Sequence, residues 1–108
     1  MKIVTLASSS KGNCTLVFNE NTKVLVDAGI KLSEINEKLK LLNIEPGEIN
    51  AVIVTHEHSD HTRSVGALVR KYGTRVYAFA EAFNEVYKTL GKIDEHRLVQ
   101  TFEVPFQF

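Results

Sequence analysis

Three of the four histidines in this chain and one aspartate fall within six residues, directly after an apolar run that favours a β-strand. They are His56, His58, Asp60 and His61. Imidazole nitrogens and carboxylate oxygens bind zinc and other borderline divalent metals, and a rigid strand can direct several such side chains at one point. The cluster therefore predicts a metal site. The alternative is a set of solvated loop histidines with an aspartate that caps the next helix, and four potential ligands at this spacing make it the weaker interpretation.

The spacing inside the cluster predicts two metal ions. His56 and His58 alternate along an extended segment, so we expect their side chains on one side, where they can share a metal ion. Asp60 and His61 follow where the chain should turn into a helix that begins near Thr62. From there they could reach a second metal ion a few ångströms away. Two-metal sites of this kind are typical of hydrolases that use a metal-activated water.

Apolar and β-branched runs predict the strands that must carry the cluster. Residues 51–55 are almost continuously apolar, which indicates a central strand covered on both faces, and the histidine cluster begins where this strand ends. Residues 15–18 and 23–26 should form a hairpin across residues 19–22. The full set of predicted strands is 2–7, 15–18, 23–26, 51–55, 75–79 and 98–104.

Helical spacing of apolar residues predicts three helices among these strands. The first should begin after Ser33, a good N-cap, and end before Pro46. The second should run up to Gly73, and the third covers residues 81–90. Because a helix connects the strands at 51–55 and 75–79, we expect these strands to be parallel. The predicted fold class is α/β (α+β), a mixed β-sheet with helices packed on one face.

Composition limits the class of protein. The 108 residues suffice for one small domain, and 13 Lys and Arg balance 13 Asp and Glu, so no overall field favours a polyanion. The single cysteine, Cys14, cannot form an internal disulfide and favours a reducing, cytoplasmic setting, most simply as a small buried hydrophobe. We see no signal peptide and no apolar run long enough to span a membrane, so we expect a soluble protein.

Two segments resemble the metallo-β-lactamase superfamily. Residues 55–61, Thr-His-Glu-His-Ser-Asp-His, are similar to its HxHxDH motif, and residues 25–29, Leu-Val-Asp-Ala-Gly, resemble the aspartate-bearing strand end that precedes that motif. Residues 7–13 and 66–72 resemble most closely the YycJ or WalJ type of the superfamily, which are 5′-to-3′ DNA exonucleases. The resemblance covers essentially the whole chain but corresponds to the N-terminal half of the family's αββα sandwich.

The resemblance implies roles for individual residues. His56 and His58 would bind the first metal, and Asp60 and His61 the second, with Asp60 also handling a proton during catalysis. Asp27 would accept a hydrogen bond from a metal-binding imidazole and so orient it. Two divalent metal ions are expected per complete site, with zinc favoured and manganese or iron as alternatives. The expected reaction is hydrolysis of a phosphodiester.

The loop expected at residues 8–13 is a candidate for contact with a substrate phosphate through Ser9, Ser10, Lys11 and Asn13. A polar connector without such a role is an equal alternative on composition alone. A nucleic acid is therefore the expected substrate and a membrane is not an expected partner. The runner-up enzyme is a thioester hydrolase of the glyoxalase II type, which has a similar histidine segment.

In the family, three later ligands complete the two metal sites, and they would lie beyond Phe108. His96 occupies a polar stretch and is not expected to replace any of them. We therefore expect residues 1–108 to form a single, incomplete domain with weak or no activity as an isolated monomer. The other alternative is a half-size metal-binding or scaffold domain. Either a homodimer or a missing C-terminal half would complete the sheet.

Overall fold

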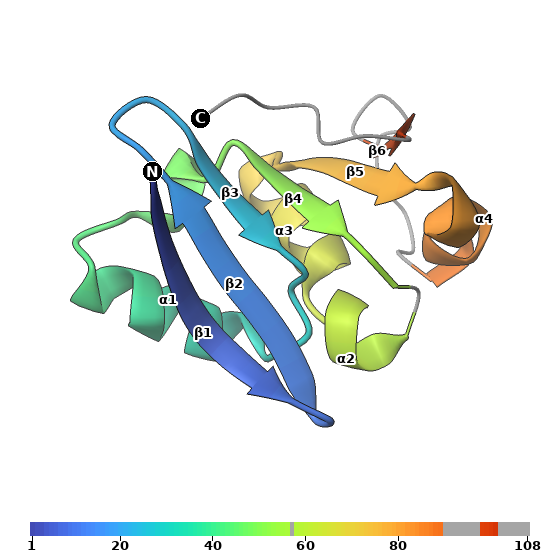
Figure 1. The fold of residues 1–108 in the computed structure, drawn as a ribbon, viewed down its shortest axis with the longest axis horizontal. Coiled ribbons are helices and arrows are strands. Elements are labelled where there is room, and N and C mark those ends of the chain that lie inside the picture. The colour runs from blue at the N-terminus through green and yellow to red at the C-terminus, as the bar shows by residue number, and fades with distance from the viewer. Residues whose placement is uncertain (57, 90–97, 102–108) are drawn as a thin grey trace.

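The computed structural model describes residues 1–56, 58–89 and 98–101, and within them the strands form one mixed sheet (Figure 1). The strands follow chain order across the sheet, β1-β2-β3-β4-β5-β6. Neighbours from β1 to β3 are antiparallel, and neighbours from β3 to β6 are parallel. The bounds are Lys2–Ser9 for β1, Gly12–Phe18 for β2, Lys23–Val26 for β3, Ala51–Val54 for β4, Arg75–Phe79 for β5 and Leu98–Thr101 for β6.

The helices connect the parallel strands, as the sequence predicts. Their bounds are Leu32–Leu41 for α1, Ser59–Thr62 for α2, Val65–Tyr72 for α3 and Ala80–Thr89 for α4, with a short 3₁₀ helix, η1, at Pro46–Glu48. The prediction of parallel strands on either side of α3 is confirmed, because β4 and β5 pair in parallel. In the described ranges, no helix has both the length and the apolar composition needed to cross a bilayer.

The start of α1 differs from the prediction, and its end has a defined cap. The N-cap is Lys31, without a side-chain hydrogen bond, so Ser33 lies inside the helix and its assignment as N-cap is wrong. At the other end, Asn43 adopts a φ of 58° and donates its N–H to Lys40, while Ile44 donates to Leu39. This pair of bonds satisfies two helix-terminal carbonyls, and asparagine tolerates the left-handed conformation that it requires.

The hairpin between β2 and β3 is confirmed, but the loop predicted at residues 8–13 is wrong. Ser8 pairs with Asn13 and Ser9 with Gly12, so both strands extend into that segment. Only Ser10 and Lys11 remain in the turn. Serine and asparagine are depleted in strands on average, whereas here the register of the β1 and β2 ladder carries them into the sheet.

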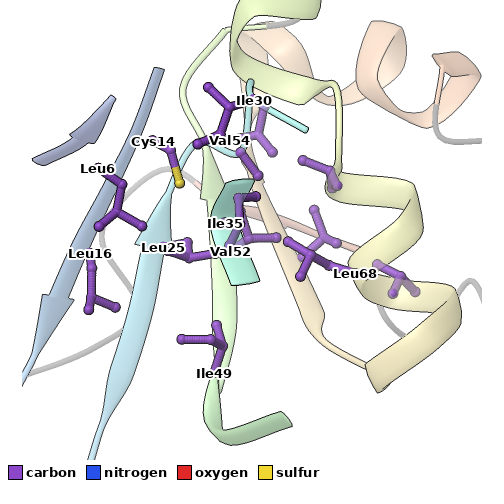
Figure 2. Close-up of a cluster of buried hydrophobic side chains, with 14 of the residues drawn as sticks. Leu6, Cys14, Leu16, Leu25, Ile30, Ile35, Ile49, Val52, Val54 and Leu68 are labelled. Atoms are coloured by element: carbon purple, nitrogen blue, oxygen red, sulfur yellow. The ribbon is translucent and has the colours of Figure 1, made fainter. Parts of the chain in front are cut away.

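One face of the sheet carries the core. The register aligns Leu16, Leu25, Val52 and Val76 in one row across four strands, and all four are fully buried. Residues of α1, α3 and α4 pack against this face, so the prediction of helices on one face holds (Figures 1 and 2). Figure 2 shows Ile35, of α1, beside Val52, of β4.

Strand β4 is buried on both faces. Its exposed fractions are 0% at Val52 and Val54, which face the helices, and 0% at Ala51 and 4% at Ile53, which face the opposite side. The prediction of a central, doubly covered strand is therefore confirmed. A strand held in this way is a rigid base for the residues that follow it.

Candidate metal centre

The candidate site lies where β3 and β4 end. Because the two strands are parallel, their carboxyl ends meet at the same edge of the sheet, which is where open α/β sheets usually bind ligands. Asp27 directly follows β3, Thr55 and His56 follow β4, and α2 begins soon afterwards at Ser59. Figure 1 shows α2 beside the ends of these strands.

Asp27 is held in a conformation that few residue types adopt. Its φ is 63°, and its N–H donates to the carbonyl oxygen of Ile53 at 2.7 Å. Aspartate tolerates the left-handed region better than most residues, whereas a β-branched residue would be strained there. The side chain is buried, with 5% of the residue exposed. Such backbone conformations cluster at functional sites, where the surrounding structure maintains them.

The carboxylate of Asp27 accepts three hydrogen bonds. Thr55 donates its backbone N–H to Oδ1 at 2.8 Å and its hydroxyl to Oδ2 at 2.6 Å. His61 contacts the same Oδ2 through Nδ1 at 2.7 Å. The ring of His61 is therefore fixed in orientation, with Nε2 left for another partner. A contact with an imidazole is what the family resemblance implies for Asp27, and metal binding by the ring of His61 remains a prediction.

His61 and Asp60 are positioned to share a metal ion. The distance between Nε2 of His61 and Oδ2 of Asp60 is 3.4 Å. Two ligands about 2.0 to 2.1 Å from a tetrahedral zinc ion lie about 3.3 Å apart. The separation therefore fits the pair expected at the second metal. The donor set, one imidazole and one carboxylate, also suits zinc, manganese or iron.

His56 lies beside His61, with ring centroids 4.6 Å apart, and its Nδ1 is 2.9 Å from the hydroxyl of Thr55. In residues 1–56, 58–89 and 98–101, Asp27, His56 and His61 form a group whose potential ligand atoms all lie within 4.8 Å of one another. The 2.7 Å between Asp27 and His61 is a hydrogen-bond length, shorter than the separation of two ligands on one metal. The contact therefore fits an Asp27 that orients His61, and metal binding by the two imidazoles remains a prediction.

His58 occupies a different position from the other cluster residues. It is the N-cap of α2, is exposed, and accepts the N–H of His61 at 2.9 Å through its carbonyl oxygen. The helix begins at Ser59, so the expectation that Asp60 precedes a helix starting near Thr62 is wrong. One helical turn brings His61 against Asp27 and Asp60 against Gly29. The pairing of His56 with His58 on one metal remains a prediction.

Residues of two neighbouring segments, 28–29 and 13, hold α2 in place. The sequence did not predict these contacts. A Cβ on Gly29 would lie 1.7 Å from the carbonyl oxygen of Asp60, so only glycine allows this approach. Ala28 donates its N–H to the carbonyl of His61 at 2.8 Å. The amide of Asn13 donates to both the carbonyl and the Oδ2 of Asp60, each at 3.3 Å. Asn13 was expected at the substrate, and here it contacts a candidate ligand.

Cys14 lies in the core beneath this site. It is fully buried, as predicted for a small hydrophobe. Burial, together with the negative charge of the nearby Asp27, raises the pKa of its thiol to about 12. A thiol with such a pKa stays protonated at neutral pH and is a poor metal ligand or nucleophile. Cys14 therefore contributes packing and no chemistry.

A surface pocket of about 350 Å³ lies beside the turn between β1 and β2. Three cations from three separate segments line it, and in the described part of the chain none of them forms an ion pair. Sequence reasoning named Lys11 alone, because Lys31 and Arg63 are distant in the chain. The lining residues are Ala7, Ser9, Lys11, Gly12, Ile30, Lys31, Glu34 and Arg63.

Comparison with known proteins gives one family and one group of relatives. The sequence model of the metallo-beta-lactamase superfamily matches residues 9–105. Exodeoxyribonuclease WalJ of Streptococcus pneumoniae serotype 2 is 43% identical over 91 residues, which cover 82% of this chain and 34% of that protein. Exodeoxyribonuclease YycJ of Bacillus anthracis is 38% identical over 88 residues, covering 82% and 33%. The chain thus spans about a third of the length of the curated relatives it matches.

Solved structures share the fold at low sequence identity. A B3 metallo-beta-lactamase with an active-site glutamic acid superimposes with a TM-score of 0.68 at 21% identity, over 77% of this chain and 32% of that one. A chemotaxis sensor described as ODP, with a peroxy diiron species, gives a TM-score of 0.70 at 15% identity, over 91% and 39%. At these identities the likeness concerns the fold alone.

Proposed function

Because this chain belongs to the metallo-β-lactamase superfamily, we propose that it carries the first half of a two-metal centre that hydrolyses phosphodiesters of DNA. The observation that carries the proposal is the 3.4 Å separation of His61 Nε2 and Asp60 Oδ2, on a ring that Asp27 orients. Relatives at 43% and 38% identity are named exodeoxyribonucleases, which supports DNA as the substrate. The fold alone would not identify the substrate, since proteins with the same fold catalyse different reactions.

The proposed ligands divide into two pairs. His56 and His58 belong to the first metal, and Asp60 and His61 to the second. Bound there, divalent ions supply positive charge that polarises a phosphodiester and acidifies water. Zinc is the proposed metal, with manganese or iron as alternatives for the same donor set.

The residues of the chain have their own tasks in this proposal. Asp27 holds the His61 ring, so its Nε2 is directed at the site before any metal arrives. Asn13 holds the Oδ2 of Asp60 at 3.3 Å, which leaves Oδ1 of that carboxylate to take up a proton. Asp60 is therefore the proposed catalytic residue.

The basic pocket is the proposed binding place for a phosphate of the DNA strand. Lys11 lines it together with Lys31 and Arg63, and beside them lie Ser9 and the turn that contains Ser10. Only one acidic residue, Glu34, shares the lining. The excess of positive charge is local, because the whole chain is neutral. Phosphate contacts of this kind supply affinity without sequence preference.

A triple variant, Lys11→Gln, Lys31→Gln and Arg63→Gln, tests the pocket. It should weaken binding of a 5′-phosphorylated single-stranded oligonucleotide, measured by fluorescence anisotropy, and should flatten the salt dependence of that binding. Lys40→Gln is the matched control, because Lys40 is exposed and does not line the pocket. Equal binding of the oligonucleotide by the triple variant and the control would show that the pocket does not bind the DNA strand.

The reaction itself is tested with two substrates. In the presence of zinc or manganese, the chain should release nucleotides slowly from a 5′-labelled DNA end, and Asp60→Asn should abolish that release. Weak turnover is expected because the ligands among the described residues leave both metals incompletely coordinated. Hydrolysis of S-lactoylglutathione instead of DNA would favour a glyoxalase II-like enzyme. Metal binding without either reaction would favour a scaffold.

The outer face of the sheet, opposite the helices, is the proposed contact for another polypeptide layer. Val17, Val24 and Ala51 form one apolar row across it, and Ile3 continues this row on β1 with 62% of its surface exposed. Val24 and Ala51 are already buried within the chain, so a second copy of the chain, or further residues of a longer chain, would cover the β1 end of the row, where Ile3 is exposed. A cytoplasmic location is also part of the proposal, supported by the single free cysteine.

A further inference from the structure

Thr55 links the carboxylate of Asp27 to the ring of His56. Its hydroxyl lies 2.6 Å from Oδ2 of Asp27 and 2.9 Å from Nδ1 of His56. The backbone N–H of the same residue donates separately to Oδ1 of Asp27 at 2.8 Å. Thr55 therefore contacts the carboxylate twice, and its side chain alone continues the contact to a candidate metal ligand.

The number of hydrogens that these groups can donate determines which atom is the donor in each hydrogen bond. A carboxylate only accepts, and a threonine hydroxyl has one hydrogen to donate. That hydrogen is used on Asp27, at the shorter of the two distances. The hydroxyl oxygen must then accept from His56, so Nδ1 of His56 carries the proton. In a neutral imidazole, the other nitrogen is then a free acceptor.

His61 has the same Nδ1-protonated tautomer, but it contacts Asp27 directly and not through a hydroxyl. Its Nδ1 donates directly to Oδ2 of Asp27 at 2.7 Å, so its Nε2 also carries a free lone pair. One buried carboxylate thus orients two imidazoles, one directly and one through a hydroxyl. The two rings are 4.6 Å apart, which places both at one site.

We propose that Thr55 is a positioning residue that sets the Nδ1–H tautomer of His56 and thereby keeps Nε2 available to a metal ion. This inference rests on the metal-binding part of the function proposed above, but not on the substrate or the reaction. A purely structural Thr55, which only ties the end of β4 to Asp27, would act through its backbone N–H. That bond is kept when the hydroxyl is removed.

The test separates these roles by substituting the hydroxyl alone. Thr55→Val preserves shape and backbone, and Thr55→Ser restores the hydroxyl. Long-range ¹H–¹⁵N NMR of the metal-free chain at a pH of about 8.5, where imidazole is ordinarily neutral, reports which ring nitrogen is protonated. His56→Gln assigns the resonances of His56, and unchanged dispersion of the amide spectrum shows that each variant is folded.

We expect His56 to carry its proton on Nδ1 in the wild type and in Thr55→Ser, and to lose this preference in Thr55→Val. His61 should keep its tautomer in all three proteins, because its partner is Asp27. The affinity for zinc should fall by about 10-fold or more in Thr55→Val and recover in Thr55→Ser. A wild-type His56 protonated on Nε2, or an unchanged tautomer in folded Thr55→Val, would overturn the proposal. If Thr55→Val does not fold, the wild-type spectrum still tests the proposal, because it shows which nitrogen of His56 is protonated.

Discussion

Asp27 joins the ends of two strands to the helix that carries two candidate ligands. Its backbone, at a φ of 63°, donates its N–H to Ile53 of β4, and its buried carboxylate accepts hydrogen bonds from Thr55 and His61, which follow β4. The resemblance to the metallo-β-lactamase superfamily implies that this carboxylate orients a metal-binding imidazole, but it does not say which one. The intervening hydroxyl of Thr55 could have been suspected, since it directly precedes the first histidine. Which group accepts the hydrogen of this hydroxyl could be inferred only from the distances to Asp27 and His56.

Cys14 offers a prediction at the same scale. Because burial raises the pKa of the thiol to about 12, alkylation by iodoacetamide at neutral pH should be very slow in the native chain and fast in denaturant. The folded state also binds the thiol proton more tightly than the unfolded state, whose thiol has a pKa near 9.0. The unfolding free energy should therefore fall as the pH rises from about 9 toward 12.

Cys14→Ala is the comparison for this effect. It should lose that alkaline decline while starting from a lower stability, because it removes a buried sulfur. Urea unfolding at several pH values between about 8 and 11 measures both quantities. Rapid alkylation of native Cys14, or parallel pH profiles for the two proteins, would contradict the burial argument.

At the scale of elements, the docking of α2 against residues 27–30 decides whether the ligands meet. Residues of this segment hold α2 through the backbone bonds from Ala28 to His61 and from Ser64 to Ala28, both 2.8 Å long. The approach is so close that Gly29 has no room for a side chain. A four-residue helix has little intrinsic stability, so its position depends on these contacts.

Gly29→Ala should therefore be strongly destabilising. The added Cβ would meet the carbonyl oxygen of Asp60 at 1.7 Å, and a backbone atom cannot rotate away. We expect a loss of about 3 kcal/mol or more in unfolding free energy, measured by urea denaturation, together with weaker zinc binding. Gly47→Ala is the matched control, because nothing lies within 4 Å of its added Cβ. Equal stability of the two variants would refute the close approach.

The sequence predicts most elements because their signals are local. The apolar run of β4 and the helical spacing of α3 are examples. The failures have a common cause, which is tertiary context. Ser8 and Asn13 enter strands because the ladder continues past them, and α2 starts at Ser59 because residues 27–30 hold it. The basic pocket was also not foreseen as a whole, since its cations come from three separate segments.

At the scale of the whole molecule, the face of the sheet opposite the helices is buried at its centre, at Val24 and Ala51, but exposed toward β1. The row of Leu16, Leu25 and Val52 packs against helices, whereas Ile3 at the edge of the opposite face is 62% exposed. Apolar residues on a sheet face with an exposed edge strand favour association.

This asymmetry predicts that the chain self-associates at micromolar concentration. Sedimentation velocity should show a species larger than the monomer, and Ile3→Glu should dissociate it, because a charge cannot be buried there without a partner. Leu41→Glu, on α1 and 82% exposed, is the control and should leave association unchanged. A monomer at all concentrations would contradict the prediction.

The central proposal is that residues of the segment that contains His56, His58, Asp60 and His61 bind a metal ion in this chain. Its most direct test is equilibrium titration of the chain with zinc, comparing the wild type with His61→Gln and with His96→Gln, a control histidine that the sequence places outside residues 56–61. We predict that His61→Gln weakens zinc binding by about 10-fold or more, whereas His96→Gln binds like the wild type. Equal zinc affinity in all three proteins would contradict the account.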